Sequence, residues 1–148
     1  MSSNCKAAYK TADVCDEAAN KALVEETMRL YGKIDVLILC AGVSAHQMFA
    51  DMKDMSMLRQ VMETNFYGYV TLTKAALNVL RENKGQIVVI NSISALIGMP
   101  FRSHYSASKF AIRGFFESIA NEEPAISVLN VYAQQMIGTA MRKNALVP

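Results

Sequence analysis

The stretch Ile34-Asp35-Val36-Leu37-Ile38-Leu39-Cys40 indicates the fold class, because it is apolar without interruption from Val36 onward. Successive side chains of a β-strand point to opposite faces of a sheet. A strand that is apolar at both odd and even positions is therefore expected to bury both of its faces. That pattern is typical of a parallel sheet that is covered by helices on both sides.

Helical and strand patterns alternate on either side of this stretch. Asp16 can cap a helix that Gly32 ends. A long helical pattern that can bend near Gly68 follows the strand, and Pro124 breaks the chain before the last strand. Helices that alternate with strands predict an α/β fold. The predicted helices are 16–31, 55–80 and 103–121, and the predicted strands are 34–40, 87–91 and 125–132.

The composition fits one domain, residues 1–148. The net charge is +2 and no segment concentrates Lys and Arg, so we expect no nucleic-acid partner. The longest apolar run, 36–43, is too short to cross a bilayer, and the N-terminus lacks the apolar core of a signal peptide. A cytoplasmic location is the default expectation, which leaves membrane anchoring of a longer parent chain open.

The cysteines and histidines are too scattered for a disulfide framework or a metal site. Cys5, Cys15 and Cys40 are widely spaced and form no Cys-x-x-Cys, and His46 and His104 are isolated. We therefore expect no bound metal, and we expect a reducing compartment.

Tyr105 and Lys109 are the first candidates for chemistry. They lie four residues apart, so a helix places both on one face, one turn apart. A free phenol has a pKa of about 10, and a nearby ammonium favours the phenolate and lowers that pKa toward neutrality. The pair can therefore act as a general acid and base. The alternative is a chance pair, because this spacing is common in helices.

Two polar residues upstream accompany this pair. Ser92 lies thirteen positions before Tyr105, directly after an apolar strand pattern, and Asn65 lies further upstream. Taken singly, Ser92 can simply end a strand and cap a turn, and Asn65 can be a hydrogen-bonding residue inside a helix. Ser94 competes for the serine role, although it lies eleven positions before Tyr105 rather than thirteen.

Together, these residues resemble the short-chain dehydrogenase/reductase family. That family has a Ser at a strand end, a Tyr-x-x-x-Lys that opens a helix, and an upstream Asn. The local wording is also similar, in Asn91-Ser92-Ile93-Ser94 and in Gly32-Lys33-Ile34-Asp35-Val36-Leu37. The resemblance extends from about Asp13 to Thr139. It implies a partial Rossmann-like domain, a doubly wound parallel sheet with helices on both faces.

The resemblance implies an oxidoreductase that exchanges hydride between NAD or NADP and a carbonyl or alcohol. It makes Tyr105 the proton donor or acceptor, and it gives Lys109 both the phenol and the nicotinamide ribose as partners. It places Ser92 at the substrate oxygen and gives Asn65 a water that links Lys109 to solvent. The implied substrate is a small alcohol or ketone, and the wording near Tyr105 favours a lipophilic one.

The resemblance also implies cofactor contacts. Asp13-Val14 is similar to the family's Asp-Val, whose acid contacts the adenine ring. Leu39-Cys40-Ala41-Gly42 is similar to the family's Asn-Asn-Ala-Gly, with both asparagines replaced. Ile137 and Thr139 are similar to the family's residues that reach the carboxamide and phosphates of the cofactor. The implied cofactor-binding residues are Asp13, Val14, Ala41, Gly42, Tyr105, Lys109, Ile137 and Thr139.

The glycine-rich loop that grips the pyrophosphate in this family has no counterpart in the sequence. The seven glycines are never closer than ten positions to one another. We therefore interpret the chain as truncated at its N-terminus, and at its C-terminus, where the family's substrate lid begins. Without the family's first strand, the strand at 34–40 is expected to be an open edge. The residue that selects NAD or NADP is absent as well.

A second hypothesis follows from this truncation: the chain is a catalytically silent binding or dimerisation subunit. The family commonly dimerises through the long helix after Asn65 and the helix of Tyr105. A homo-oligomer, or a pair with a full-length relative, is therefore expected. A serine hydrolase is disfavoured, because no Gly-x-Ser-x-Gly turn occurs.

Overall fold

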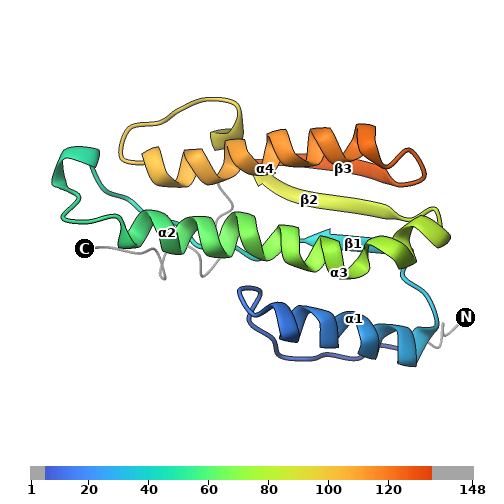
Figure 1. Ribbon diagram of the computed structural model, residues 1–148. Coiled ribbons are helices and arrows are strands. Elements are labelled where there is room, and N and C mark those ends of the chain that lie inside the picture. The colour runs from blue at the N-terminus through green and yellow to red at the C-terminus, as the bar shows by residue number, and fades with distance from the viewer. Residues whose placement is uncertain (1–5, 135–148) are drawn as a thin grey trace, which may run out of the picture.

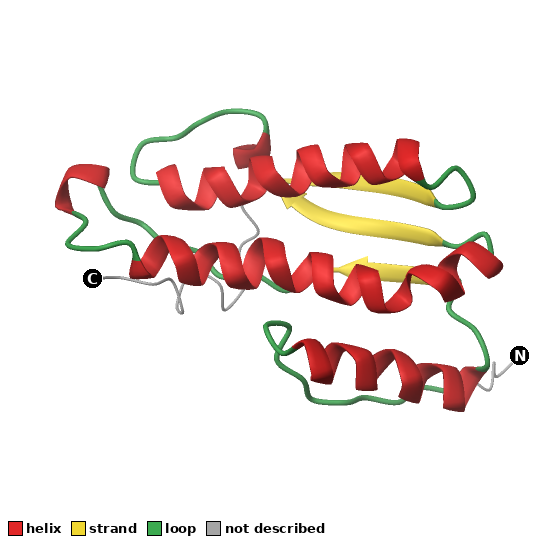
Figure 2. Ribbon diagram, in the orientation of Figure 1, coloured by secondary structure: helices red, strands yellow, loops and turns green. Residues whose placement is uncertain are grey.

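The computed structural model describes residues 6–134, and in that range helices and strands alternate as predicted. Short 3₁₀ turns, Phe49–Asp51 and Ile93–Ala95, lie in the connections. The α/β class is therefore confirmed (Figures 1 and 2). The helices and strands are α1 (Glu17–Tyr31), β1 (Val36–Leu39), α2 (Ser56–Met62), α3 (Gly68–Glu82), β2 (Gln86–Ser92), α4 (Ser103–Glu122) and β3 (Ser127–Ala133).

The three strands form one parallel sheet in the order β1-β2-β3. The register places Leu37, Ile87 and Val128 side by side across the sheet. Because neighbouring strands run in the same direction, their carboxyl ends meet at one edge of the sheet. That edge carries Cys40 after β1 and Ser92 at the end of β2.

Helices cover one face of this sheet. Helix α3 contacts β1, helix α4 contacts β2 and β3, and α1 packs against α3 (Figure 1). The covered face carries Leu39, Ile87 and Val89, which are at most 2% exposed, and helix residues such as Phe116 complete the core. Burial of these aliphatic and aromatic side chains is the main favourable contribution to folding.

The second face of the sheet has no helix over it in residues 6–134 (Figure 2). Its side chains remain largely accessible, with Val36 49%, Ile38 61%, Leu129 48% and Val131 37% exposed. The expectation of helices on both faces therefore holds for one face only within the described part of the chain. The apolar pattern of β1 is nevertheless real, because both of its faces carry aliphatic side chains.

The long helix predicted over 55–80 contains a π turn, Glu63–Tyr67, between α2 and α3. The Gly68 N–H donates to the Glu63 carbonyl five residues back, which is the π-helical pattern. Gly68 also allows a close approach, since a Cβ there would lie 2.9 Å from Val14 Cγ2. The bend expected near Gly68 is thus a change of hydrogen-bond register, and such turns often occur at functional sites.

Helix α1 begins and ends at the predicted residues. Asp16 Oδ1 accepts hydrogen bonds from the Ala18 and Ala19 amides, at 2.9 and 3.1 Å. Gly32 ends the helix in the left-handed conformation, with φ of 74°.

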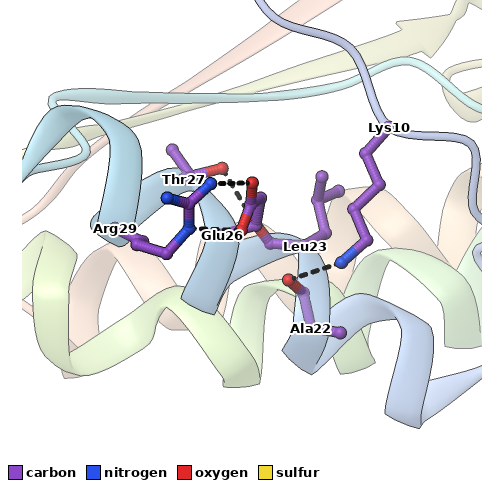
Figure 3. A network of polar contacts seen from close by, with 6 residues as sticks. All are labelled: Lys10, Ala22, Leu23, Glu26, Thr27 and Arg29. Atoms are coloured by element: carbon purple, nitrogen blue, oxygen red, sulfur yellow. Dashed lines mark hydrogen bonds and ion pairs between the residues drawn. The ribbon is translucent and has the colours of Figure 1, made fainter.

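The segment before α1, which includes Lys10, runs alongside that helix and is hydrogen-bonded to it. Lys10 Nζ donates to the Ala22 carbonyl at 3.0 Å, and Glu26 pairs with Arg29 close by (Figure 3). In residues 6–134, no helix combines the length and the apolar character that crossing a membrane requires.

Two adjacent residues of β1 provide a test of the uneven burial of the sheet. We expect Leu39→Ala to lower the free energy of unfolding by about 2–5 kcal/mol, because it leaves a cavity in the covered face. We expect Ile38→Ala to lower it by about 1 kcal/mol or less, because that side chain is exposed. Urea denaturation of both variants measures the difference. Equal losses would show that the second face is covered in solution.

Candidate active site

Tyr105 and Lys109 lie on one face of α4, in its first turns, as the sequence predicts. Both are buried, with 6% of Tyr105 and 3% of Lys109 exposed. Lys109 Nζ lies 5.7 Å from the centroid of the Tyr105 ring. The phenol and the ammonium therefore share one environment, which the chance-pair alternative did not require.

The ammonium of Lys109 is a buried cation without an acidic partner among residues 6–134. Its one hydrogen bond within the described part of the chain, to the Ile90 carbonyl, is long at 3.5 Å. The ring of Tyr69 lies as close as that of Tyr105, at 5.7 Å. Burial lowers the pKa of Lys109 to about 8, and the nearby Cys40 thiol opposes that shift.

Arg102 brings a second cation to Tyr105, and the sequence reasoning missed it. Its Cζ lies 5.1 Å from the Tyr105 ring centroid, and its Nη1 donates to Ser44 Oγ at 3.1 Å. The available signal was the spacing of three residues, which places Arg102 and Tyr105 on one helix face. Arg102 therefore links the loop after β1 to the phenol.

Ser92 ends β2, and its side chain caps the turn that follows. Its Oγ accepts a hydrogen bond from the Ser94 amide at 3.2 Å, as the capping alternative described. That turn packs against α4, and Asn91 Nδ2 donates to the Lys109 carbonyl at 3.4 Å. Within residues 6–134, no hydrogen bond uses the Ser92 hydroxyl as a donor.

Asn65 lies in the π turn, fully buried, and its side chain joins three segments. It exchanges hydrogen bonds with the backbone of Val43, at 2.8 Å to the amide and 3.0 Å to the carbonyl. It also donates to Ser108 Oγ at 3.1 Å, and Ser108 donates to the Tyr105 carbonyl at 2.8 Å. Asn65 thus fixes the loop after β1 and the start of α4 relative to each other.

The residues proposed for the adenosine side of the cofactor have structural contacts of their own. Asp13 Oδ1 accepts from the Cys15 amide at 2.9 Å, in the turn before α1. Val14 lies against Gly68, at the end of the π turn. Ala41 and Gly42 follow β1 and are half-buried. Ile137 and Thr139 lie outside the described residues.

The chain belongs to the short-chain dehydrogenase family, because the family model described as short chain dehydrogenase matches residues 2–146. It is 41% identical over 111 residues to dehydrogenase/reductase SDR family member 7B of Xenopus laevis, covering 74% of this chain and 34% of that protein. It is 38% identical over 111 residues to 11-beta-hydroxysteroid dehydrogenase A of Sesamum indicum, covering 75% of this chain and 32% of that protein. The chain thus spans about a third of the length of these curated relatives.

Solved structures have the same fold. A short-chain dehydrogenase/reductase from Saccharomyces cerevisiae has a TM-score of 0.85 at 28% identity, covering 92% of this chain and 53% of that one. An alcohol dehydrogenase from Thermococcus sibiricus, complexed with 5-hydroxy-NADP, has a TM-score of 0.85. Its 18% identity supports the fold alone, over 95% of this chain and 59% of that one. The parallel sheet described above is therefore part of a Rossmann-like α/β fold.

The burial of Lys109 predicts how stability depends on pH. Its pKa is about 8 in the folded chain and 10.5 ordinarily, so between these values the unfolded chain binds more protons. The contribution of Lys109 to the free energy of unfolding therefore increases as pH rises from about 8 to about 10.5, by on the order of 3 kcal/mol. Urea denaturation across that range should show this rise in the wild type and lose it in Lys109→Met.

The exposed Lys53 provides the matched control, since Lys53→Met should keep the full rise. An unchanged pH dependence in Lys109→Met would mean that burial does not lower the pKa of Lys109.

Proposed function

We propose that this chain forms the proton-transfer part of an NAD(P)-dependent oxidoreductase that acts on alcohols or ketones. The observation that carries the proposal is the buried ammonium of Lys109 beside the phenol of Tyr105, without a neutralising carboxylate among the described residues. Tyr-x-x-x-Lys in this setting is a device for moving a proton, rather than a structural ion pair. Family membership supports the same activity.

Tyr105, Lys109 and Ser92 have separate roles in the proposed reaction. In reduction, the Tyr105 hydroxyl gives its proton to the substrate carbonyl oxygen, and in oxidation the phenolate takes the hydroxyl proton back. The ammonium of Lys109 stabilises the Tyr105 phenolate that forms or reacts in each direction. The Ser92 hydroxyl donates to the substrate oxygen and holds it near the phenol. A bound nicotinamide cofactor supplies or accepts the hydride.

The described residues fit the nicotinamide ribose end of such a cofactor. Among residues 6–134, Lys109 has a single long hydrogen bond, so its ammonium can bind a polar ligand. Asp13, Val14, Ala41 and Gly42 are proposed for the adenosine side, and Ile137 and Thr139 for the carboxamide and phosphates. The spacing of the glycines gives this sequence no glycine-rich loop for the pyrophosphate.

Asn65 is proposed to act through its backbone. Its amide group is already engaged by Val43 and Ser108, so the side chain is not free to hold a water. In the π turn, the backbone carbonyls accept hydrogen bonds from amides five residues later instead of four. This change of register can leave a carbonyl oriented toward a ligand. A water on that carbonyl is the proposed link from Lys109 to solvent.

Exposed apolar side chains support a lipophilic substrate. Two loops near the start of α4 are joined by a hydrogen bond from the Gln47 amide to the Phe101 carbonyl, at 3.0 Å. Phe101 has a positive φ of 64°, a strained conformation for a bulky residue that often occurs at functional sites. Arg102 connects these loops to Tyr105. The exposed apolar side chains of the two loops include Met48, Phe49, Leu96, Ile97 and Phe101.

Removal of one hydroxyl tests the proton-transfer role. We expect Tyr105→Phe to abolish turnover of an alcohol or ketone while the affinity for NADH or NADPH stays nearly unchanged, because the ring and the lysine remain. Turnover is followed by nicotinamide absorbance and affinity by fluorescence titration. The matched control is Tyr31→Phe, at an exposed position on α1, which should leave both quantities unchanged. Residual turnover in Tyr105→Phe comparable to the wild type would remove Tyr105 from its role.

The second candidate function, a silent binding or dimerisation subunit, is favoured by the exposed sheet face. Four aliphatic side chains of β1 and β3 are accessible there, and β1 is an edge strand that can pair with another chain. A partner with a strand and an apolar surface would cover both features. Homo-oligomerisation through the long helices is an alternative contact, because Tyr67 and Phe110 are 50% and 42% exposed.

Two charge substitutions separate these contacts. If the chain self-associates through the sheet, Ile38→Glu should convert the oligomer to a monomer in light scattering, since it places a charge in the apolar contact. If the long helices form the contact, Phe110→Glu should do so instead. Cofactor titration decides between the two functions. No binding of NADH or NADPH by an associating chain would favour the silent subunit over the oxidoreductase.

A further inference from the structure

Tyr69 of α3 is the second aromatic residue beside Lys109, and it has no role in the site described so far. Its side chain is 1% exposed, and its ring centroid lies 5.7 Å from Lys109 Nζ. The two helices that carry these residues lie side by side over the covered face of the sheet (Figure 1). The lysine is thus within cation–π distance of rings from two helices.

A buried ammonium needs compensation, and the described polar groups provide little of it. The carbonyl of Ile90 is at the limit of hydrogen-bond distance. The Asn65 amide is engaged by Val43 and Ser108, and Asn91 binds the backbone carbonyl of Lys109 rather than its ammonium. Among the described residues, the aromatic rings are the remaining source of stabilisation for the charge. Attraction to a ring face is stronger where water is excluded.

We infer that Tyr69 is a positioning residue, whose ring holds the Lys109 ammonium next to Tyr105. The part of this inference that concerns catalysis rests on the proposed function, whereas the contact itself does not. Tyr69 is well placed for it, because Gly68 packs closely against Val14 and fixes the start of α3. The ring then determines where the end of a long and otherwise flexible side chain lies.

The hydroxyl of Tyr69 is separable from its ring. Its oxygen is buried without a hydrogen-bond partner in residues 6–134. The inference assigns the positioning to the ring, so the loss of the hydroxyl alone should change little at Lys109. Tyr69→Phe keeps the ring and nearly the whole volume, which makes it the reference variant.

Among residues 6–134, the titratable groups besides Tyr69 that interact with Lys109 are Cys40 and Tyr105. Cys40 follows β1, and its thiol favours the charged form of the lysine. Tyr105 lies on α4, the helix of Lys109 itself. Both groups are retained in the variants below, and Tyr69→Phe and the fluorinated variant both lack the hydroxyl, so a difference between these two variants reports on the ring.

The test weakens the ring's attraction for cations without changing its shape. The full chain is prepared as Tyr69→Phe and with trifluorophenylalanine at position 69, because fluorine withdraws the electron density that attracts the ammonium. The pKa of Lys109 is measured by NMR of lysine labelled with carbon-13 at Cε, and its signal is identified with Lys109→Arg. Circular dichroism and the melting temperature verify that each variant folds.

We expect Tyr69→Phe to leave the pKa of Lys109 nearly unchanged and the fluorinated ring to lower it by about 0.5–1 unit. The shift is downward because the ring stabilises the charged form. Trifluorophenylalanine at Tyr67, which is half exposed in the π turn, is the matched control and should have no effect. An unchanged or raised pKa in the fluorinated Tyr69 variant would overturn the inference.

Catalysis provides an independent second measurement. If the chain turns over substrate, the pH profile of kcat should shift in the fluorinated variant while Tyr69→Phe retains the wild-type profile. The NMR measurement needs no turnover, so a shift in the pKa without activity supports the contact and counts against the proposed function. Activity that depends on Tyr105, without a shift in the pKa, supports the proposed function and rejects the role of Tyr69.

Discussion

The burial of a positive charge at the carboxyl edge of the sheet is the constraint on which the site depends. Lys109 is 3% exposed and has no acidic partner among residues 6–134. Such a charge is tolerated only where surrounding groups are held firmly, because loosening them would leave it uncompensated. Lys109 therefore needs the rings of Tyr69 and Tyr105 and the end of β2 around it. This requirement fixes how α3, α4 and the sheet pack together.

Asn65 connects the segments that surround this charge through its side-chain hydrogen bonds. Its amide joins the loop after β1 to α4, and the π turn around it changes the hydrogen-bond register of the long helix. The close contact of Gly68 with Val14 adds the turn before α1 to the same junction. Elements that are far apart in the sequence thus converge beside the phenol and the ammonium.

The two faces of the sheet differ in how far their side chains are buried. One face is closed by α3 and α4 and contains the core, whereas the other leaves the aliphatic side chains of β1 and β3 accessible. An apolar face of this kind is a common contact surface for another element or chain. The two candidate functions therefore concern different parts of one structure, the site at the sheet edge and the uncovered face.

The sequence by itself determined the features that depend on neighbours within a few residues. The caps at Asp16 and Gly32, the α/β alternation and the shared helix face of Tyr105 and Lys109 follow from local periodicity and backbone preference. Only the tertiary structure decided that Tyr69 also approaches Lys109, that Asn65 binds Val43 and Ser108, and that one face of the sheet is covered. The physical reason is that contacts between elements depend on packing and register, and a local pattern constrains neither.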